Sequence, residues 1–293
     1  MFICSLLIIT GGIHQEEKRM VKNKIQSHNA RISNVDTQPK TIIQRPHLQS
    51  QPHSQLQSQP KPRQGQWQLI WNDEFGNEFS FKDWNLQDWP SDKNGEWQYY
   101  TPENVKVSAG NLVIESKRER FKGREYTSGA LTTENKLEFT YGKIDIRAKL
   151  PKGQGVFPAF WLVNSMNGTW LPEIDMMENL GNAPNELYFV VHWQDANGTK
   201  KRDFTHFVSK DVDFSEDFHL YSLIWEKDRI VWLVDHQIVF QTKQFSPSTP
   251  LFLYLNTAIG GNWPGPPSQS EQYPKEMLID YVRVYQKHDG SGH

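Results

Sequence analysis

The chain has 293 residues, a net charge of −2 and one cysteine. This length suits one large domain or two small ones, and the near-neutral charge argues against nucleic acid or an anionic membrane surface as a partner. The single cysteine excludes an internal disulfide and argues against a Cys/His zinc site, while an aromatic content of 13% fits both a large core and flat platforms for sugar rings.

The first 64 residues are predicted to lie outside the folded domain. Residues 1–13 contain a short apolar run that cannot span a bilayer as a helix. The run resembles the core of a secretory signal but lacks a preceding basic residue, so we interpret it as a signal or an anchor, with a misassigned start as the alternative. Residues 14–64 are rich in Gln, Pro and Ser, which predicts a disordered linker. We expect a secreted or cell-envelope protein in which membrane association involves only this N-terminus.

Residues 65–288 are β-rich, and residues 289–293 form a short tail. The segment 104–119 predicts two strands around a turn at 109–111, and 228–240 predicts two strands joined at Asp235-His236. Further strand patterns are KIDIRAKL, ELYFVVHW and MLIDYVRVYQ. Many short strands without a long amphipathic helix indicate one all-β domain, an antiparallel sandwich or barrel.

The segment WLPEIDMMENL places three carboxylates, Glu173, Asp175 and Glu178, within six residues. Side chains two positions apart share one face of a strand, so Glu173 and Asp175 point the same way. Glu178 lies an odd number of positions away and would face the opposite side of a regular strand. A β-bulge at Met176-Met177 would turn all three acids to one face and leave one Met to the core.

Three carboxylates on one face repel each other, so at least one pKa is expected to rise. Glycoside hydrolysis uses one ionised and one protonated carboxyl across the scissile bond, which fits this arrangement. A calcium site and an exposed acidic edge are the alternatives that the local sequence leaves open.

The motif EIDMME resembles the signature E-x-D-x-x-E of glycoside hydrolase family 16, in its bulged form. Segments such as LIWNDEF, LNTAIGGNWPG and MLIDYVRVYQ resemble family segments in the expected order, across about Trp67 to Gln286. The resemblance implies a jelly-roll sandwich of two curved antiparallel sheets with an open cleft. It also implies a retaining mechanism in which Glu173 is the nucleophile, Glu178 the acid/base and Asp175 an assistant to Glu173.

The resemblance further implies residues that bind substrate or metal, and no cofactor for catalysis. His192 matches a family histidine near the acid/base residue, and several tryptophans match aromatic positions along the sugar cleft: Trp161, Trp170, Trp263 and, more weakly, Trp97. A structural Ca²⁺ is implied at Glu74, the Gly110 carbonyl and Asp280. Core or surface roles are the alternatives for each of these residues.

The resemblance implies an endo-acting enzyme, expected to be a monomer, that cuts β-1,3- or mixed β-1,3-1,4-glucan. Many laminarin-cutting relatives carry Arg where this chain has Ala130, which weakens the inference to pure β-1,3-glucan. The alternatives are a glycanase for a bacterial exopolysaccharide or an algal galactan, a transglycosylase, and a glucan-binding protein without activity. Because all three acids are present, the binding protein is the less favoured alternative.

Overall fold

The structure is a computed structural model that describes residues 65–76, 81–164 and 170–288. The predicted signal or anchor (1–13), linker (14–64) and tail (289–293) lie outside these residues. Within the described ranges, no helix is long and apolar enough to cross a membrane; the helices there are short 3-10 turns, η1 (Phe81–Asp83), η2 (Lys93–Gly95) and η3 (Pro102–Asn104).

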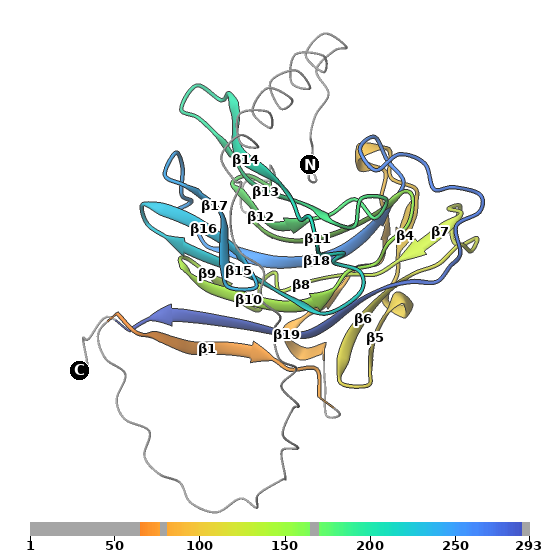
Figure 1. The fold of residues 1–293 in the computed structure, drawn as a ribbon, viewed down its shortest axis with the longest axis horizontal. Helices are drawn as coiled ribbons and strands as arrows, with labels where there is room; N and C mark the ends of the chain where they lie inside the picture. The colour runs from red at the N-terminus through yellow and green to blue at the C-terminus, as the bar shows by residue number, and fades with distance from the viewer. Residues whose placement is uncertain (1–64, 77–80, 165–169, 289–293) are drawn as a thin grey trace, which may run out of the picture. The chain divides into compact units, whose positions relative to one another are not determined.

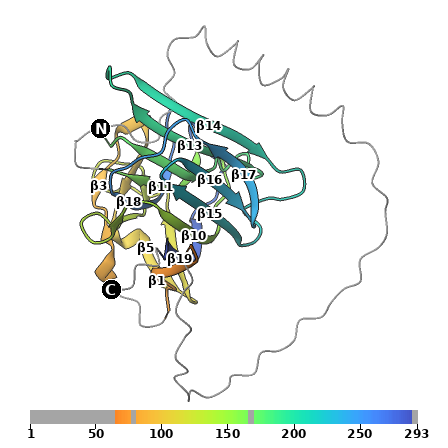
Figure 2. The same ribbon diagram turned by 90° about the vertical axis from the view of Figure 1, so that its left-hand side faces the viewer.

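Two antiparallel sheets form the described domain (Figures 1 and 2). Sheet A runs in the order β17 (Gln237–Thr242), β16 (Arg229–Val234), β15 (His219–Glu226), β10 (Gly142–Lys149), β19 (Lys275–Lys287), β6 (Asn111–Ser116) and β5 (Val105–Ser108), with β1 (Trp67–Asp73) paired to β19. Sheet B runs in the order β14 (Lys200–Val208), β13 (Glu186–Gln194), β12 (Glu173–Glu178), β11 (Val156–Val163), β18 (Leu251–Ile259), β8 (Ala130–Thr132) and β2 (Asn85–Leu86), with β9 (Glu138–Phe139) paired to β18. A third, small sheet holds β3 (Trp89–Pro90), β4 (Gln98–Tyr100) and β7 (Tyr126–Ser128).

Both predicted hairpins are confirmed. The strands β5 and β6 meet at the turn Ala109-Gly110, and β16 and β17 are joined by Asp235 and His236 alone. The φ angles of these last two residues are 46° and 68°. Positive φ at both central positions is the geometry of a type I′ turn, whose twist matches that of the flanking strands.

The main apolar core fills the space between the two sheets, and a second cluster covers the other face of sheet B. Strand β11 serves both, because its side chains alternate: Phe160 and Leu162 enter the core, whereas Ala159, Trp161 and Val163 join the second cluster. Strand β11 is buried along its whole length, which explains its continuous apolar sequence. We call the face of sheet B that carries Ala159, Trp161 and Val163 its outer face.

A tryptophan links the core to the strand that carries the three acids. Trp232 of β16 is fully buried, stacks on Phe240 with ring centroids 4.8 Å apart, and donates from Nε1 to the Asp175 carbonyl at 2.9 Å. This hydrogen bond joins sheet A to sheet B directly behind the acidic group.

Replacing Trp232 with Phe should therefore destabilise the domain by about 1–3 kcal/mol, because a buried carbonyl loses its donor. Urea denaturation of the full chain measures the free energy of unfolding. Trp97→Phe is a matched control, since Trp97 is 39% exposed. Equal effects of the two substitutions would contradict a structural role for the Trp232 hydrogen bond.

Candidate active site

The three acids of β12 share the outer face of sheet B, and a bulge brings them there. Between β11 and β12 the pairing shifts, so that Trp161 lies opposite Asp175 and the preceding residue of β11 lies opposite Met177. Met176 is the extra residue. The register with β13 shifts at the same point, so the bulge is present on both sides of β12.

The sequence analysis expected only one methionine of the bulge in the core, but the structure places both there. Met176 and Met177 are each about 1% exposed or less, and both belong to the core between the sheets. Two flexible thioether side chains fill the irregular space that the bulge creates.

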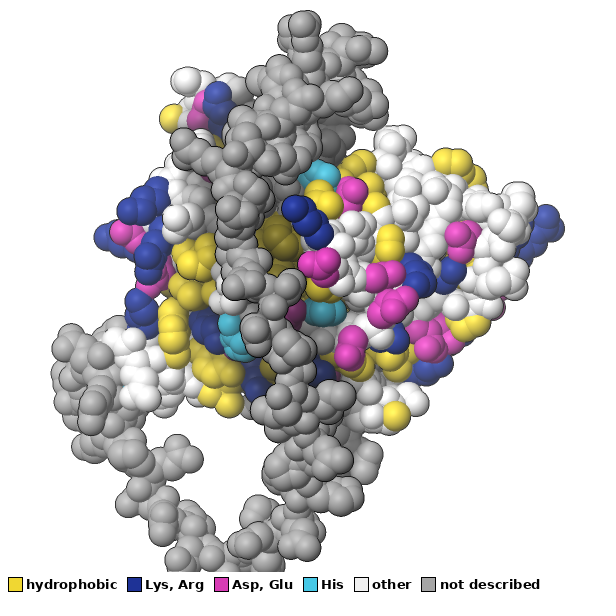
Figure 3. Space-filling model, in the orientation of Figure 1, with side chains coloured by type: hydrophobic (Ala, Val, Ile, Leu, Met, Phe, Trp, Pro, Cys, Tyr) yellow, Lys and Arg dark blue, Asp and Glu magenta, His cyan; other side chains and the backbone are white. Residues whose placement is uncertain are grey.

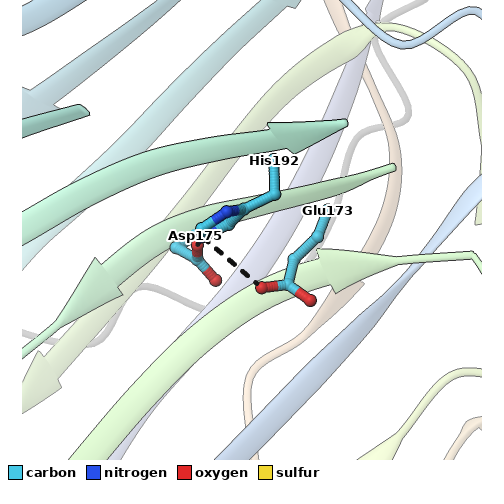
Figure 4. A group of neighbouring side chains, drawn as sticks. All are labelled: Glu173, Asp175 and His192. Carbon is cyan, nitrogen blue, oxygen red and sulfur yellow. Dashed lines mark ion pairs between the residues drawn. The ribbon is translucent and has the colours of Figure 1, made fainter. Parts of the chain in front are cut away.

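All three carboxylates are buried, at 3% exposure for Glu173, 0% for Asp175 and 2% for Glu178. Figure 4 shows His192 of β13 beside Glu173 and Asp175. Its Nε2 lies 3.3 Å from Oδ2 of Asp175 and 3.9 Å from Oε1 of Glu173. The ligand atoms of these three residues lie within 4.8 Å of one another, so they could hold a metal ion. Their place next to Glu178 equally suits acid–base chemistry.

Electrostatics within this group favour a bound proton. Burial raises the pKa of the Glu173 carboxyl well above its ordinary value, and the charges of Asp175 and Glu178 raise it further. Ionising all the acids would place like charges together away from water, which is costly. Glu173 therefore holds its proton to a higher pH than an isolated glutamic acid does.

An aromatic stack borders the acids on the side of β11 and β18. The Trp161 ring stacks on Tyr254 at 4.4 Å and on Trp170 at 5.6 Å. The structure differs from the sequence prediction for Trp161, because only 1% of this residue is exposed. Trp170 is partly exposed, so of these two stacked indoles only Trp170 offers a surface that a ligand could reach.

The orientation of Trp161 is fixed by polar residues that the sequence analysis did not assign to the site. Its Nε1 donates to Asn256 at 2.8 Å, and the Asn256 amide donates to the Tyr100 hydroxyl at 3.0 Å. The sequence feature that could have identified this network is the polar Asn256 within the largely apolar strand LFLYLNTAI. A buried polar residue in such a strand indicates a hydrogen-bonded network.

The two remaining tryptophans lie apart from this stack. Trp263 is partly exposed and meets Phe157 and Tyr188 edge to face, at 5.1 and 4.7 Å. Trp97 packs over Gly260, where an added Cβ would come within 2.7 Å of the indole ring. The structure thus brings Trp263 next to Tyr188 of β13, the strand that carries His192, and places Trp97 against Gly260, directly after the end of β18.

The residues predicted to bind calcium lie on sheet A or beside it. Both oxygens of Glu74 accept hydrogen bonds from Arg283, at 2.8 Å each, and Asp280 accepts one from Arg147 at 2.6 Å. Calcium needs six to eight oxygen ligands, and the Glu74 carboxylate already faces a cation. This donor set does not fit a calcium ion as arranged, and the calcium site stays a prediction.

Comparisons with known proteins agree with the geometry. The family model described as glycosyl hydrolases family 16 matches residues 92–283, and a second one, for the β-glucan synthesis-associated proteins SKN1/KRE6/Sbg1, matches residues 1–179.

Three relatives illustrate the likeness. The clotting factor G alpha subunit of Tachypleus tridentatus is 35% identical over 75% of this chain, which spans only 34% of that protein. A β-glucanase of Rhodothermus marinus is 33% identical over 79% of this chain and 90% of its own length. The laminarinase catalytic domain of Thermotoga maritima superposes with a TM-score of 0.69 at 38% identity, over 76% of this chain and 99% of that one. The ordered strands, the bulged acidic motif and these similarities together show that the chain belongs to glycoside hydrolase family 16.

Proposed function

We propose that this protein is an endo-acting β-glucanase that cuts β-1,3- or mixed β-1,3-1,4-glucan with retention of configuration. The observation that carries the proposal is the single bulge of β12, which turns Glu173, Asp175 and Glu178 to one face. The similarity to β-glucanases and a laminarinase supports glucan as the substrate.

Glu173 is the nucleophile in this proposal, and Glu178 is the general acid and then the general base. Acid catalysis needs one proton on this pair of glutamates, and the raised pKa of Glu173 favours keeping a proton within the pair. When it resides on Glu178, Glu173 is ionised and attacks the anomeric carbon while the leaving oxygen takes the proton. Asp175 lies between them along the strand and pairs with His192, which positions its carboxyl beside Glu173.

Transglycosylation is the second candidate, because the glycosyl-enzyme can pass its sugar to a sugar hydroxyl instead of water. The match of residues 1–179 to proteins associated with β-glucan synthesis favours it. Both candidates use the same carboxylates and differ only in the acceptor of the second step.

Three further properties are proposed: location, metal binding and assembly. A polysaccharide substrate and the apolar run within residues 1–13 favour an extracellular or envelope-bound enzyme. A structural Ca²⁺ at Glu74, Gly110 and Asp280 rests on the family resemblance and would require Glu74 and Asp280 to leave Arg283 and Arg147. We also propose a monomer.

The activity is tested by incubating the full chain with laminarin, barley mixed-linkage glucan and agarose, and measuring new reducing ends. We expect release from one or both glucans and none from agarose. Glu173→Gln removes the nucleophile and should abolish release, because the glycosyl-enzyme cannot form. A folded protein that binds a glucan and never cuts it would favour the binding-protein alternative.

The roles of the two glutamates are separated by azide rescue with an aryl β-laminaribioside. Glu178→Ala should lower turnover by about 10²–10⁴-fold, the usual contribution of general acid–base catalysis. Azide should then restore activity and yield a β-glycosyl azide, because it replaces water in the second displacement. With Glu173→Ala, azide should instead yield the α-glycosyl azide through a single displacement. The reverse pattern of anomers would exchange the two assignments.

The raised pKa of Glu173 predicts a stability effect of Glu173→Gln that is opposite to its effect on activity. The folded-state pKa lies above the ordinary value of 4.5, so the wild type loses stability as the pH rises above 4.5 towards the folded-state pKa. The Gln variant does not titrate and should gain relative stability over that range. Unfolding by urea from about pH 4 to about pH 8 measures the difference, with Glu125→Gln as an exposed control (69% exposed). Parallel pH profiles of wild type and Glu173→Gln would contradict the prediction.

A further inference from the structure

The outer face of sheet B continues beyond the acids to the edge strand β14. Glu178 of β12 lies opposite Tyr188 of β13, and Tyr188 lies opposite His206 of β14. Residues paired in this way point to the same face. Neither Tyr188 nor His206 has a part in the mechanism above, although both extend the row that begins at Glu178.

Tyr188 and His206 form one rigid unit with Glu186. The two rings stack in parallel, with centroids 4.4 Å apart and an interplanar angle of 2°. Oε2 of Glu186 lies 2.8 Å from His206 Nε2 and accepts a hydrogen bond from the Tyr188 hydroxyl at 3.3 Å. Two ordered rings that share one carboxylate lose little conformational entropy when a ligand arrives.

This unit is open to solvent and lies beside an apolar wall. The side chains of His206 and Glu186 are 32% and 30% exposed, and the partly exposed Trp263 meets Tyr188 edge to face at 4.7 Å. Burial and the neighbouring acids raise the pKa of Tyr188 far above its ordinary value, so its hydroxyl remains a donor. On the face drawn in Figure 3, histidine and acidic side chains lie among apolar ones.

We infer that Glu186, Tyr188 and His206, together with Trp263, bind the sugar on the leaving-group side of the scissile bond. A carboxylate, a hydroxyl and an imidazole match the hydroxyl groups of a pyranose, and the indole matches its C–H face. The inference rests on the proposed function, in which Glu178 protonates the leaving oxygen. The departing sugar must then lie beside Glu178, where the row of Tyr188 and His206 begins.

The same subsite receives the acceptor in the second step. The glycosyl-enzyme is attacked from the side that the first leaving group vacated, so a sugar bound there competes with water. These residues therefore determine how much of the product is transferred to sugar.

The test compares two leaving groups in the full chain. His206→Ala should lower kcat/KM for laminarin about 10-fold, because hydrogen bonds around a charged group are lost. Turnover of an aryl β-laminaribioside should change by less than about 2-fold, since the aryl group leaves without a sugar contact. With laminaribiose added to the aryl substrate, the wild type should form longer oligosaccharides and the variant far fewer.

His219→Ala is the matched control, because His219 forms a similar pair with Asp235, at 2.7 Å, on sheet A. It should leave all three readouts unchanged. Glu186→Gln keeps the shape of the side chain and should shift the readouts in the same direction as His206→Ala, which guards against a folding defect in either variant.

Equal losses on laminarin and on the aryl substrate, or no loss on either, would overturn the subsite. Failure of the wild type on both substrates would overturn the proposed function itself, and the subsite with it. A loss confined to the sugar leaving group and the sugar acceptor supports the inference.

Discussion

The site depends on a β-bulge, which accommodates Met176 in β12 without changing the face of the residues that follow. If β12 were a regular strand with Met176 paired like its neighbours, alternation would turn Glu178 toward the core, among side chains such as Phe160 and Ile174. A carboxylate buried there without a partner would be neutralised or would destabilise the fold. The bulge removes this conflict, because the core keeps two methionines and the outer face gains the third acid.

The arrangement that makes the site reactive also opposes folding. Three buried carboxylates stand within one short strand, and burial together with their like charges raises the pKa of Glu173 well above its ordinary value. The surrounding structure offsets this cost with a continuous core on one side of β12 and the Trp161 stack on the other. Trp232, which holds the backbone at Asp175 from the opposite sheet, allows the strand to keep its shape while its charges repel each other. Local strain supported by a rigid scaffold is typical of functional sites.

Strand positions and the acidic face were predictable because both follow from the alternation of side chains along a strand. The turns at 109–110 and 235–236 were predictable because each separates two short stretches that have the pattern of a strand. Trp161 was assigned to the cleft surface because sequence gives its face and not its depth, and Tyr254 and Trp170 cover it. The arginines paired with Glu74 and Asp280 come from distant strands, so these ion pairs could not be predicted from any local sequence pattern.

The pair of Tyr188 and His206 shows more clearly which part of the site could not be predicted from the sequence. The two residues are 18 positions apart, and each lies in a strand whose pattern is explained by pairing alone. Only the register between β13 and β14 brings their rings together and places both next to Glu178. A single shift of that register would turn His206 to the other face.

Strand β12 therefore divides the outer face into two parts with different chemistry. Toward β11 and β18 the surface is an aromatic stack, which suits the apolar face of a bound sugar. Toward β13 and β14 it is a polar group of fixed rings and a carboxylate, which suits hydroxyl groups. Because the covalent step is the same for water and for sugar, the acids of β12 cannot select between these acceptors. Selection must come from the residues that hold the acceptor in place, so it can change through β13 and β14 while the acids and their bulge stay the same.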